Sequence, residues 1–213
     1  MTTAYWFDLD GTLLGYDRSF DAMLEDCLGG SQPERVHETF RQAMFVALES
    51  FDDVPYEHGF EVLRSECDLD IDVAEMTADF RDIELAATEV VPGSRSILAS
   101  MAERGPVGIL TNGDGEMQRA KIQRHDLDEL VDAVIVSNEV DTRKPEREIF
   151  DIAREHLSAD RYVYVGDSYE EDIVGAREAG FTAIHVRNDD GPELSIDRLQ
   201  SLNVLLETTG DTH

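Results

Sequence analysis

Short apolar runs separated by helix-length segments constrain the fold of this chain more than any other feature. Five runs have the length of a β-strand, and the later ones are rich in Val and Ile. They are residues 4–9, 107–110, 131–136, 162–165 and 182–186. The segments between the later runs have the length of helices. This alternation predicts an α/β fold built on a doubly wound parallel sheet.

Helices are expected over residues 95–104, 115–125, 145–156 and 169–179. The third of them opens with Pro145, a residue suited to the first helical turn. Gly180 follows the last one in the manner of a helix C-cap. After Gly191 the pattern leaves open a strand at 195–198 or a helix through Leu206, and residues 208–213 are expected to form a frayed tail.

Residues 17–89 interrupt the alternation and contain no convincing strand. Apolar residues recur there every three or four positions, as from Phe20 to Leu28, which is typical of amphipathic helices. Asp72 begins the last of four such stretches as part of a capping box. We therefore expect an all-helical insert at 17–89, with residues 1–16 and 90–213 forming the core.

Two carboxylates follow the first expected strand. Asp8 and Asp10 are separated by one residue, so strand alternation places both on the same side. Gly11 lets the chain turn away at once, and Thr12 follows it. The pattern predicts two acidic side chains projecting from the end of one strand.

Three more polar motifs follow later strands or precede helices. Thr111, Asn112 and Gly113 offer a hydroxyl, an amide and backbone N–H groups at a strand-to-helix turn, which suits an anion. Lys144 precedes a helix, and Asp167, Ser168 and Asp172 follow the fourth strand. Because functional groups in such sheets gather at the carboxyl ends of the strands, we expect all four motifs to meet at one edge.

Together these motifs resemble those of hydrolases of the haloacid dehalogenase superfamily. Asp-x-Asp-Gly-Thr, the Thr-Asn-Gly turn, Lys-Pro and Gly-Asp-Ser-x-x-x-Asp have the expected order and spacing. The resemblance covers roughly residues 4–16 and 90–190, and the helical insert occupies the place of the family's C1 cap. These motifs are specific for the superfamily and carry little information on the substrate.

The resemblance implies a mechanism with Asp8 as nucleophile, forming an aspartyl phosphate. Asp10 would act as a general acid and then as a base. A Mg²⁺ ion would be held by Asp8, the main-chain carbonyl of Asp10, and Asp167.

The remaining motif residues have supporting roles in this interpretation. Thr111, the backbone at Asn112 and Gly113, and Lys144 would bind the transferring phosphoryl group. Asp172 would orient Lys144 or a metal-bound water rather than ligate directly, with Thr12 and Ser168 in support. Many relatives carry Asn where this chain has Glu171.

Asp10 favours a phosphatase over a 2-haloacid dehalogenase, because a leaving halide needs no proton and an alkoxide does. A phosphosugar mutase and a non-catalytic binding domain stay open as alternatives. The expected substrate is a small phosphorylated metabolite, with phosphoglycolate, sugar phosphates and nucleotides all possible. The six histidines show no ligand spacing and are expected to be structural or surface residues.

Charge and composition exclude several classes of partner. The formal net charge is −29, which repels nucleic-acid phosphates and anionic lipid. No apolar stretch is long enough to span a membrane. Two cysteines, Cys27 and Cys67, offer no disulfide framework, so we expect a cytoplasmic protein. We also expect a monomer or a homodimer.

The basic residues are also unusual, because only two of the eighteen are lysines. Few lysines combined with abundant carboxylates are typical of proteins from salt-in halophiles. The segment 17–89 alone carries −15 of the net charge. This distribution predicts a chain whose compact state needs salt to screen carboxylate repulsion.

We expect the melting temperature to rise from dilute buffer into molar KCl, because the screening length falls from about 30 Å at 0.01 M to about 3 Å at 1 M salt. Thermal melts over a KCl series at constant Mg²⁺ measure this. A melting temperature that stays flat or falls as KCl increases would contradict the halophile interpretation.

Overall fold

The computed structural model describes residues 1–186, 195–196 and 199–202 and divides the chain into two compact units. Unit 1 comprises Met1–Gly15, Val90–Asn112 and Ile122–His213. Unit 2 comprises Tyr16–Glu89 and Gly113–Lys121. Their assignment as a catalytic core and a cap stays a prediction. Within the described part of the chain, no helix has the length and apolar character needed to cross a bilayer.

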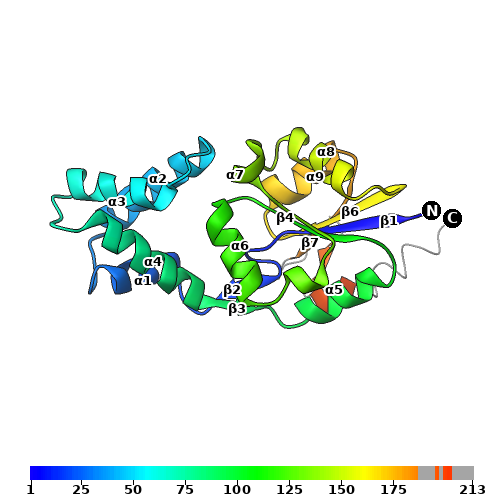
Figure 1. The fold of residues 1–213 in the computed structure, drawn as a ribbon, viewed down its shortest axis with the longest axis horizontal. Helices are drawn as coiled ribbons and strands as arrows, with labels where there is room; N and C mark the ends of the chain where they lie inside the picture. The colour runs from blue at the N-terminus through cyan, green and yellow to red at the C-terminus, as the bar shows by residue number, and fades with distance from the viewer. Residues whose placement is uncertain (187–194, 197–198, 203–213) are drawn as a thin grey trace. The chain divides into compact units, whose positions relative to one another are not determined.

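Unit 1 is built on a six-stranded parallel sheet with the order β5-β4-β1-β6-β7-β8 (Figure 1). The strands are β1 (Thr3–Phe7), β4 (Val107–Thr111), β5 (Ala133–Val136), β6 (Arg161–Gly166), β7 (Thr182–Val186) and β8 (Ser195–Ile196). The expected doubly wound parallel sheet is confirmed. The first strand in sequence lies in the middle, between β4 and β6, so polar residues after these three strands come together at one edge.

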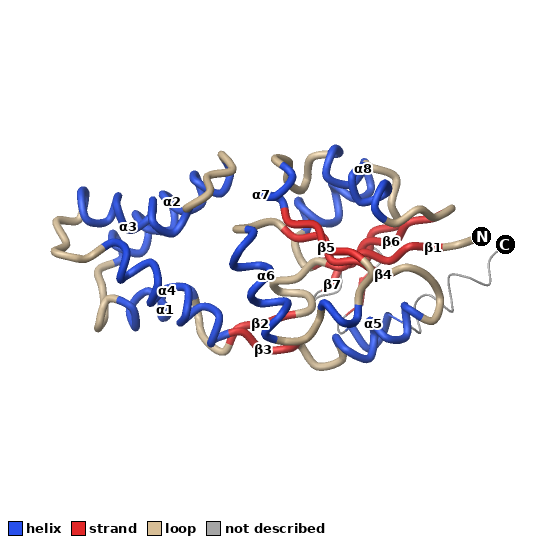
Figure 2. The backbone as a smooth tube through the Cα atoms, in the orientation of Figure 1, coloured by secondary structure: helices blue, strands red, loops and turns tan. Residues whose placement is uncertain are grey.

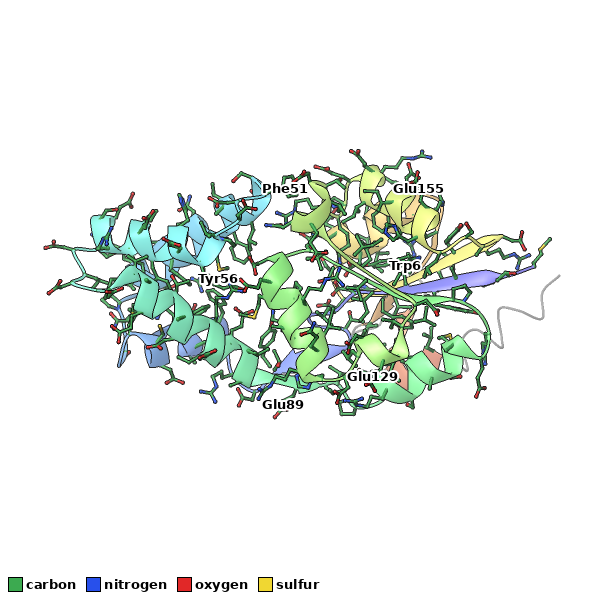
Figure 3. All side chains as sticks on the ribbon, viewed as in Figure 1. Trp6, Phe51, Tyr56, Glu89, Glu129 and Glu155 are labelled. Atoms are coloured by element: carbon green, nitrogen blue, oxygen red, sulfur yellow. The ribbon has the colours of Figure 1, made fainter. Side chains whose placement is uncertain are left out.

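Alternating residues of β1 fill the two faces of this sheet. Tyr5 and Phe7 pack on one face with α5 (Ser94–Ala102). Ala4 and Trp6 pack on the other with α8 (Arg147–His156) and α9 (Gly175–Glu178), and Figures 2 and 3 show these layers and Trp6. Burial of each large apolar side chain contributes about 1.5–3 kcal/mol relative to exposure.

Four helices of unit 2 surround an aromatic centre. They are α1 (Phe20–Cys27), α2 (Glu34–Glu49), α3 (Pro55–Glu66) and α4 (Val73–Ala87). Phe20, Phe40, Phe60 and Phe80 pack together with ring centroids 4.6–6.0 Å apart. Asp72 is the helix N-cap of α4, as expected, and its carboxylate accepts a hydrogen bond from the Glu75 amide at 3.1 Å.

One short strand, at Thr88–Val90, departs from the expectation that residues 17–89 hold none, and its partner strand lies just before residue 17. β2 (Leu14–Tyr16) and β3 (Thr88–Val90) form a separate two-stranded sheet. At three residues each, they are too short to show an alternating pattern, and pairing between distant segments stabilises them. The expectation for 17–89 was therefore wrong at its C-terminal end.

The helix expected to open at Pro145 begins two residues later, at Arg147. The Lys144–Pro145 peptide bond is cis, and the Glu146 amide donates to the Arg143 carbonyl at 2.8 Å, so this segment forms a turn. The assignment of Pro145 to the first helical turn was wrong.

Other boundaries agree within a few residues. The remaining elements are α6 (Gly115–Arg124), η1 (Asp128–Leu130), α7 (Ser137–Val140), the π-helical segment η2 (Tyr169–Val174) and η3 (Leu199–Ser201). The segment after Gly191 contains a short strand, β8, followed by η3. The helix considered through Leu206 and the tail at 208–213 extend outside the described residues.

A buried ion pair joins two helical segments of unit 2. Lys121 of α6 is 3% exposed, and its Nζ lies 2.7 Å from Glu84 Oε1 on α4. The same ammonium donates to the Tyr16 hydroxyl at 2.7 Å. Tyr56 donates to the other oxygen of Glu84 at 2.8 Å. Burial, followed by the charge of Glu84, raises the pKa of Tyr56 well above its usual value, so Tyr56 stays a donor.

We expect Lys121→Met to destabilise the protein by about 3–5 kcal/mol, because the substitution leaves the Glu84 carboxylate buried without its cation. The matched control is Arg147→Met, which removes an exposed i,i+4 partner of Asp151 and should cost about 0.5 kcal/mol or less. Denaturant unfolding of both variants measures the difference. Equal losses in the two variants would contradict a stabilising role for the buried pair.

Candidate active site

The carboxylate of Asp8 lies at the carboxyl end of β1. Its amide donates to the Val165 carbonyl at 2.9 Å, which continues the pairing of β1 with β6 beyond Phe7. The side chain is only 8% exposed, and its Oδ1 lies 2.7 Å from Lys144 Nζ. The structure therefore presents Asp8 as a buried carboxylate paired with a buried cation.

Lys144 uses all of its ammonium donors inside the protein. Nζ donates to Asp8 Oδ1 at 2.7 Å, to Asp172 Oδ1 at 2.6 Å and to the Tyr164 hydroxyl at 2.9 Å. An ammonium group has three N–H bonds, so each has a partner. One side chain thus joins residues from three segments of unit 1.

Burial and neighbouring charges shift the pKa values of Lys144 and Asp8 in opposite directions. Burial alone would lower the pKa of Lys144, but Asp172 and Asp8 together raise it well above its usual value, so the lysine stays protonated. Burial raises the pKa of Asp8 well above its usual value, and the nearby Lys144 offsets this only in part. In the folded protein, the ionised form of Asp8 is therefore disfavoured relative to a carboxylate in water.

Asn112 fixes the backbone that carries Lys144. Its Oδ1 accepts from the Lys144 amide at 2.9 Å, and its Nδ2 donates to the Lys144 carbonyl at 3.0 Å. Thr111, the last residue of β4, is 1% exposed, and Gly113 continues the turn with φ 139°. The Asn112 side chain therefore holds the lysine segment, which leaves its backbone as the part suited to an anion.

Asp167 follows β6 and is accessible to solvent. Thr12 donates to Asp167 Oδ1 at 3.3 Å. A Cβ on Gly11, which has φ 87°, would lie 2.3 Å from Asp167 Oδ2, so only glycine fits beside this carboxylate. Partial loss of solvation inside the protein raises the pKa of Asp167, and the negative charge of Asp172 raises it further.

Asp172 is fully buried within the π-helical segment η2. Its Oδ2 accepts from the Ser168 amide at 2.9 Å, and its Oδ1 accepts from Lys144. The Ser168 hydroxyl accepts from the Glu171 amide at 3.4 Å and caps η2. Asp172 thus contacts Lys144 directly, as expected for a residue that orients the lysine.

These residues fit a divalent cation such as Mg²⁺. Carboxylate oxygens of Asp8, Asp167 and Asp172 lie within 4.8 Å of one another. Three carboxylates face a single ammonium, so a divalent cation would offset the excess charge, and oxygen ligands are those that Mg²⁺ prefers. Asp10 follows two residues after Asp8, is partly buried and forms a bridge with Leu14.

The sequence did not single out Tyr164 or Arg143. Tyr164 lies in β6, accepts from Lys144, and donates to the Leu110 carbonyl at 2.8 Å. Glu171, noted only as a departure from relatives, accepts from Asn112 Nδ2 at 3.0 Å and pairs with Arg143 at 3.3 Å. A tyrosine inside an apolar strand is expected to be core, so no signal in the sequence pointed to its hydroxyl.

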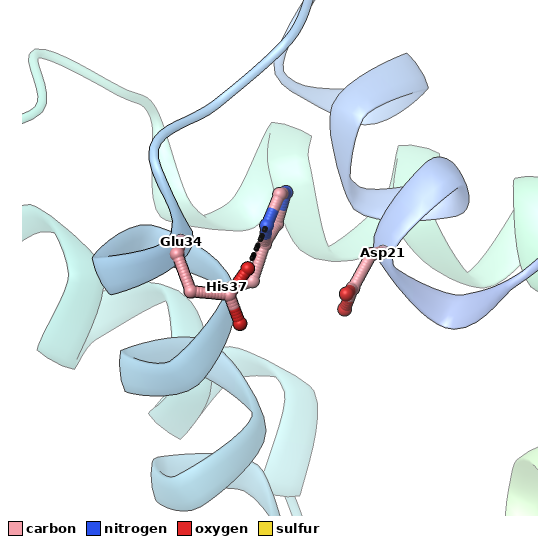
Figure 4. A group of neighbouring side chains, drawn as sticks. All are labelled: Asp21, Glu34 and His37. Carbon is pink, nitrogen blue, oxygen red and sulfur yellow. Dashed lines mark ion pairs between the residues drawn. The ribbon is translucent and has the colours of Figure 1, made fainter.

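A second group with metal-ligating side chains lies in unit 2 (Figure 4). Asp21 of α1 and Glu34 and His37 of α2 have ligand atoms within 4.8 Å of one another. However, Arg41 donates to Asp21 at 2.7 Å and to Glu34 at 3.1 Å. The guanidinium already supplies the positive charge, so we interpret this group as an arginine-bridged cluster.

Comparison with known proteins places these observations in a family context. A model of the haloacid dehalogenase-like hydrolase family matches residues 2–180. The chain is 29% identical over 203 residues to a glyceraldehyde 3-phosphate phosphatase of Methanothermobacter thermautotrophicus, covering 89% of this chain and 87% of that protein. It is 32% identical over 126 residues to the pyrimidine 5'-nucleotidase YjjG of Escherichia coli. That match covers 54% of this chain and 56% of YjjG, so it spans about half of that relative.

The fold is also similar to solved structures. A HAD phosphatase from Thermococcus onnurineus is 26% identical, with a TM-score of 0.68 over 97% of this chain and 98% of that one. The similarity therefore extends over nearly the whole of both chains.

We expect Asp8→Asn to raise the melting temperature in metal-free buffer. Because burial raises the pKa of Asp8, its ionised form costs stability above that pKa, and the neutral amide removes this cost. A gain of 1 kcal/mol corresponds to about 2–4 °C for a chain of this size. Calorimetry with EDTA measures the shift, with the exposed Asp151→Asn on α8 as control. A lower melting temperature for Asp8→Asn than for the unsubstituted protein would contradict this.

Proposed function

The chain belongs to the haloacid dehalogenase-like hydrolase family, and from this premise we propose that it is a Mg²⁺-dependent phosphomonoesterase with Asp8 as nucleophile. The observation that carries the proposal is the buried pair of Asp8 and Lys144, next to Asp167 and Asp172 at the carboxyl ends of β1 and β6. The pair orients a carboxylate at the sheet edge where this fold class binds ligands.

In the first step an oxygen of Asp8 attacks phosphorus and forms an acyl phosphate, while the bond from phosphorus to the leaving oxygen breaks. Asp10 gives a proton to that leaving oxygen. In the second step Asp10 takes a proton from water, the water oxygen attacks phosphorus, and the bond to Asp8 breaks to release inorganic phosphate.

Other residues stabilise the charge of the transferring group. Thr111, the amides following it at Asn112 and Gly113, and Lys144 would bind the equatorial oxygens. Asp172 would keep Lys144 oriented, since the two are in contact at 2.6 Å. Asp8, Asp167 and the carbonyl of Asp10 would hold Mg²⁺, which supplies positive charge against the repulsion between carboxylate and phosphate.

The substrate is proposed to be a small phosphorylated metabolite. The two relatives described above are named for glyceraldehyde 3-phosphate and for pyrimidine nucleotides, so both compounds belong in a substrate panel. Asp10 favours phosphate esters over haloacids, because only an alkoxide needs its proton. A mutase would transfer phosphate to a second sugar hydroxyl instead of to water, and product analysis separates the two.

The composition supports a proposal about the cellular compartment and the partners of this protein. Cys27 and Cys67 are both free, which supports a reduced, cytoplasmic protein. The net charge of −29 supports the absence of nucleic-acid and membrane partners. We propose that the protein acts as a monomer or homodimer in concentrated salt.

We expect Asp8→Asn to abolish hydrolysis of p-nitrophenyl phosphate with Mg²⁺ in molar KCl, since an amide oxygen is a poor nucleophile. Asp10→Asn should slow a sugar phosphate far more than p-nitrophenyl phosphate, because p-nitrophenolate departs without a proton. Steady-state rates for both variants on both substrates test this.

The control is Asp151→Asn, a carboxylate-to-amide change at a half-exposed side chain of α8, which should retain activity. More than a few per cent of residual turnover in Asp8→Asn would refute the nucleophile assignment. Equal losses on the two substrates in Asp10→Asn would show that Asp10 acts through geometry or metal binding.

A further inference from the structure

His185 lies at the carboxyl end of β7, beside the strand that presents Asp167. In the register of the two parallel strands, His185 is opposite Gly166, the last residue of β6. The residue is only 7% exposed. Backbone pairing between these strands ends here, one residue before Asp167.

The imidazole continues the contact where the backbone pairing stops. His185 Nε2 lies 2.8 Å from the main-chain carbonyl oxygen of Asp167. A carbonyl can only accept, so Nε2 carries the proton and donates. The other nitrogen, Nδ1, is buried and has no hydrogen-bond partner among the residues that the structure describes.

A tyrosine ring lies beside the imidazole at a tilted angle of 52°. The ring of Tyr169, the first residue of η2, has its centroid 5.9 Å from that of His185. The histidine is therefore packed between the end of the sheet and the start of the segment that follows Asp167.

Asp167 depends on its backbone for its placement. Its carboxylate accepts a long hydrogen bond from Thr12 at 3.3 Å and another from its own main-chain amide. The next residue, Ser168, is held through its amide by Asp172. The His185 hydrogen bond is the contact that fixes the carbonyl of Asp167 itself, and it comes from a strand that holds none of the four motifs.

We propose that His185 is a positioning residue for the metal ligand Asp167, acting through the main-chain carbonyl and not by touching metal or substrate. This inference rests on the proposed function, because it concerns the same Mg²⁺ site. Groups that hydrogen-bond to metal ligands commonly change metal affinity by about 10- to 100-fold when they are removed.

The test compares two substitutions of similar size. His185→Met cannot donate to the carbonyl, whereas His185→Gln can donate through its amide nitrogen. His156→Phe is the control, because Nδ1 of His156, an exposed residue of α8, also lies 3.0 Å from a main-chain carbonyl, that of Ile152. Binding of Mn²⁺ is titrated by electron paramagnetic resonance at constant KCl, and turnover is measured across a Mg²⁺ series.

We expect His185→Met to bind Mn²⁺ at least roughly tenfold more weakly, and the Mg²⁺ concentration for half-maximal rate should rise in parallel. At saturating Mg²⁺ most of kcat should return. His185→Gln should lie near the unsubstituted protein, and His156→Phe should match it. If His185→Met does not fold, His185→Phe takes its place, because its ring fills the same space.

Unchanged Mn²⁺ affinity in a folded His185→Met or His185→Phe variant would overturn the inference. So would equal weakening in the Gln and Met variants, which would indicate a packing effect. If the unsubstituted protein binds Mn²⁺ and hydrolyses phosphate esters, these outcomes leave the proposed function in place. If it does neither, the proposed function fails and the inference falls with it.

Discussion

The buried ammonium of Lys144 is the interaction on which the candidate site depends. It is the cation between Asp8, after β1, and Asp172, in η2, and it also donates to Tyr164 in β6. The ammonium has one N–H bond for each of these three partners, so each contact constrains the positions of the others. Asn112 then holds the Lys144 backbone from the end of β4. Three neighbouring strands are thus tied to one charge.

Glycines stand near this charge because carboxylates lie close to the strand ends and leave no room for a side chain there. A Cβ on Gly166 would lie 2.3 Å from the Asp172 carboxylate, and one on Gly11 would lie equally close to Asp167. Carboxylates can approach the strand ends this closely only because no side chain occupies those positions. The acidic cluster is therefore built into the backbone path, and burial raises the pKa of two of its members, Asp8 and Asp167.

Much of the fold could be predicted because its signals are local. Apolar runs indicated the positions of β1, β4, β5, β6 and β7. The parallel order with β1 between β4 and β6 explains why motifs distant in sequence meet. The short β2 and β3 could not be found, because pairing between distant segments defines them. The sequence also did not indicate which side chains of the sheet form hydrogen bonds to the residues of the candidate site. Tyr164 and His185 both lie in apolar strands, and only the folded structure shows their contacts. Tyr164 donates to a main-chain carbonyl and accepts from Lys144, and His185 contacts Asp167.

The two lysines of this chain have a practical consequence for chemistry in solution. Both are buried, Lys121 at 3% and Lys144 at 2% exposure, and both ammonium groups are hydrogen-bonded. Acylating reagents need an accessible, deprotonated amine, so neither side chain can react in the native state. Each modified lysine would instead mark an opening of its own unit, Lys121 in unit 2 and Lys144 in unit 1. The acylation rates of the two lysines therefore measure the local unfolding of the two units separately, in a single protein without an added label.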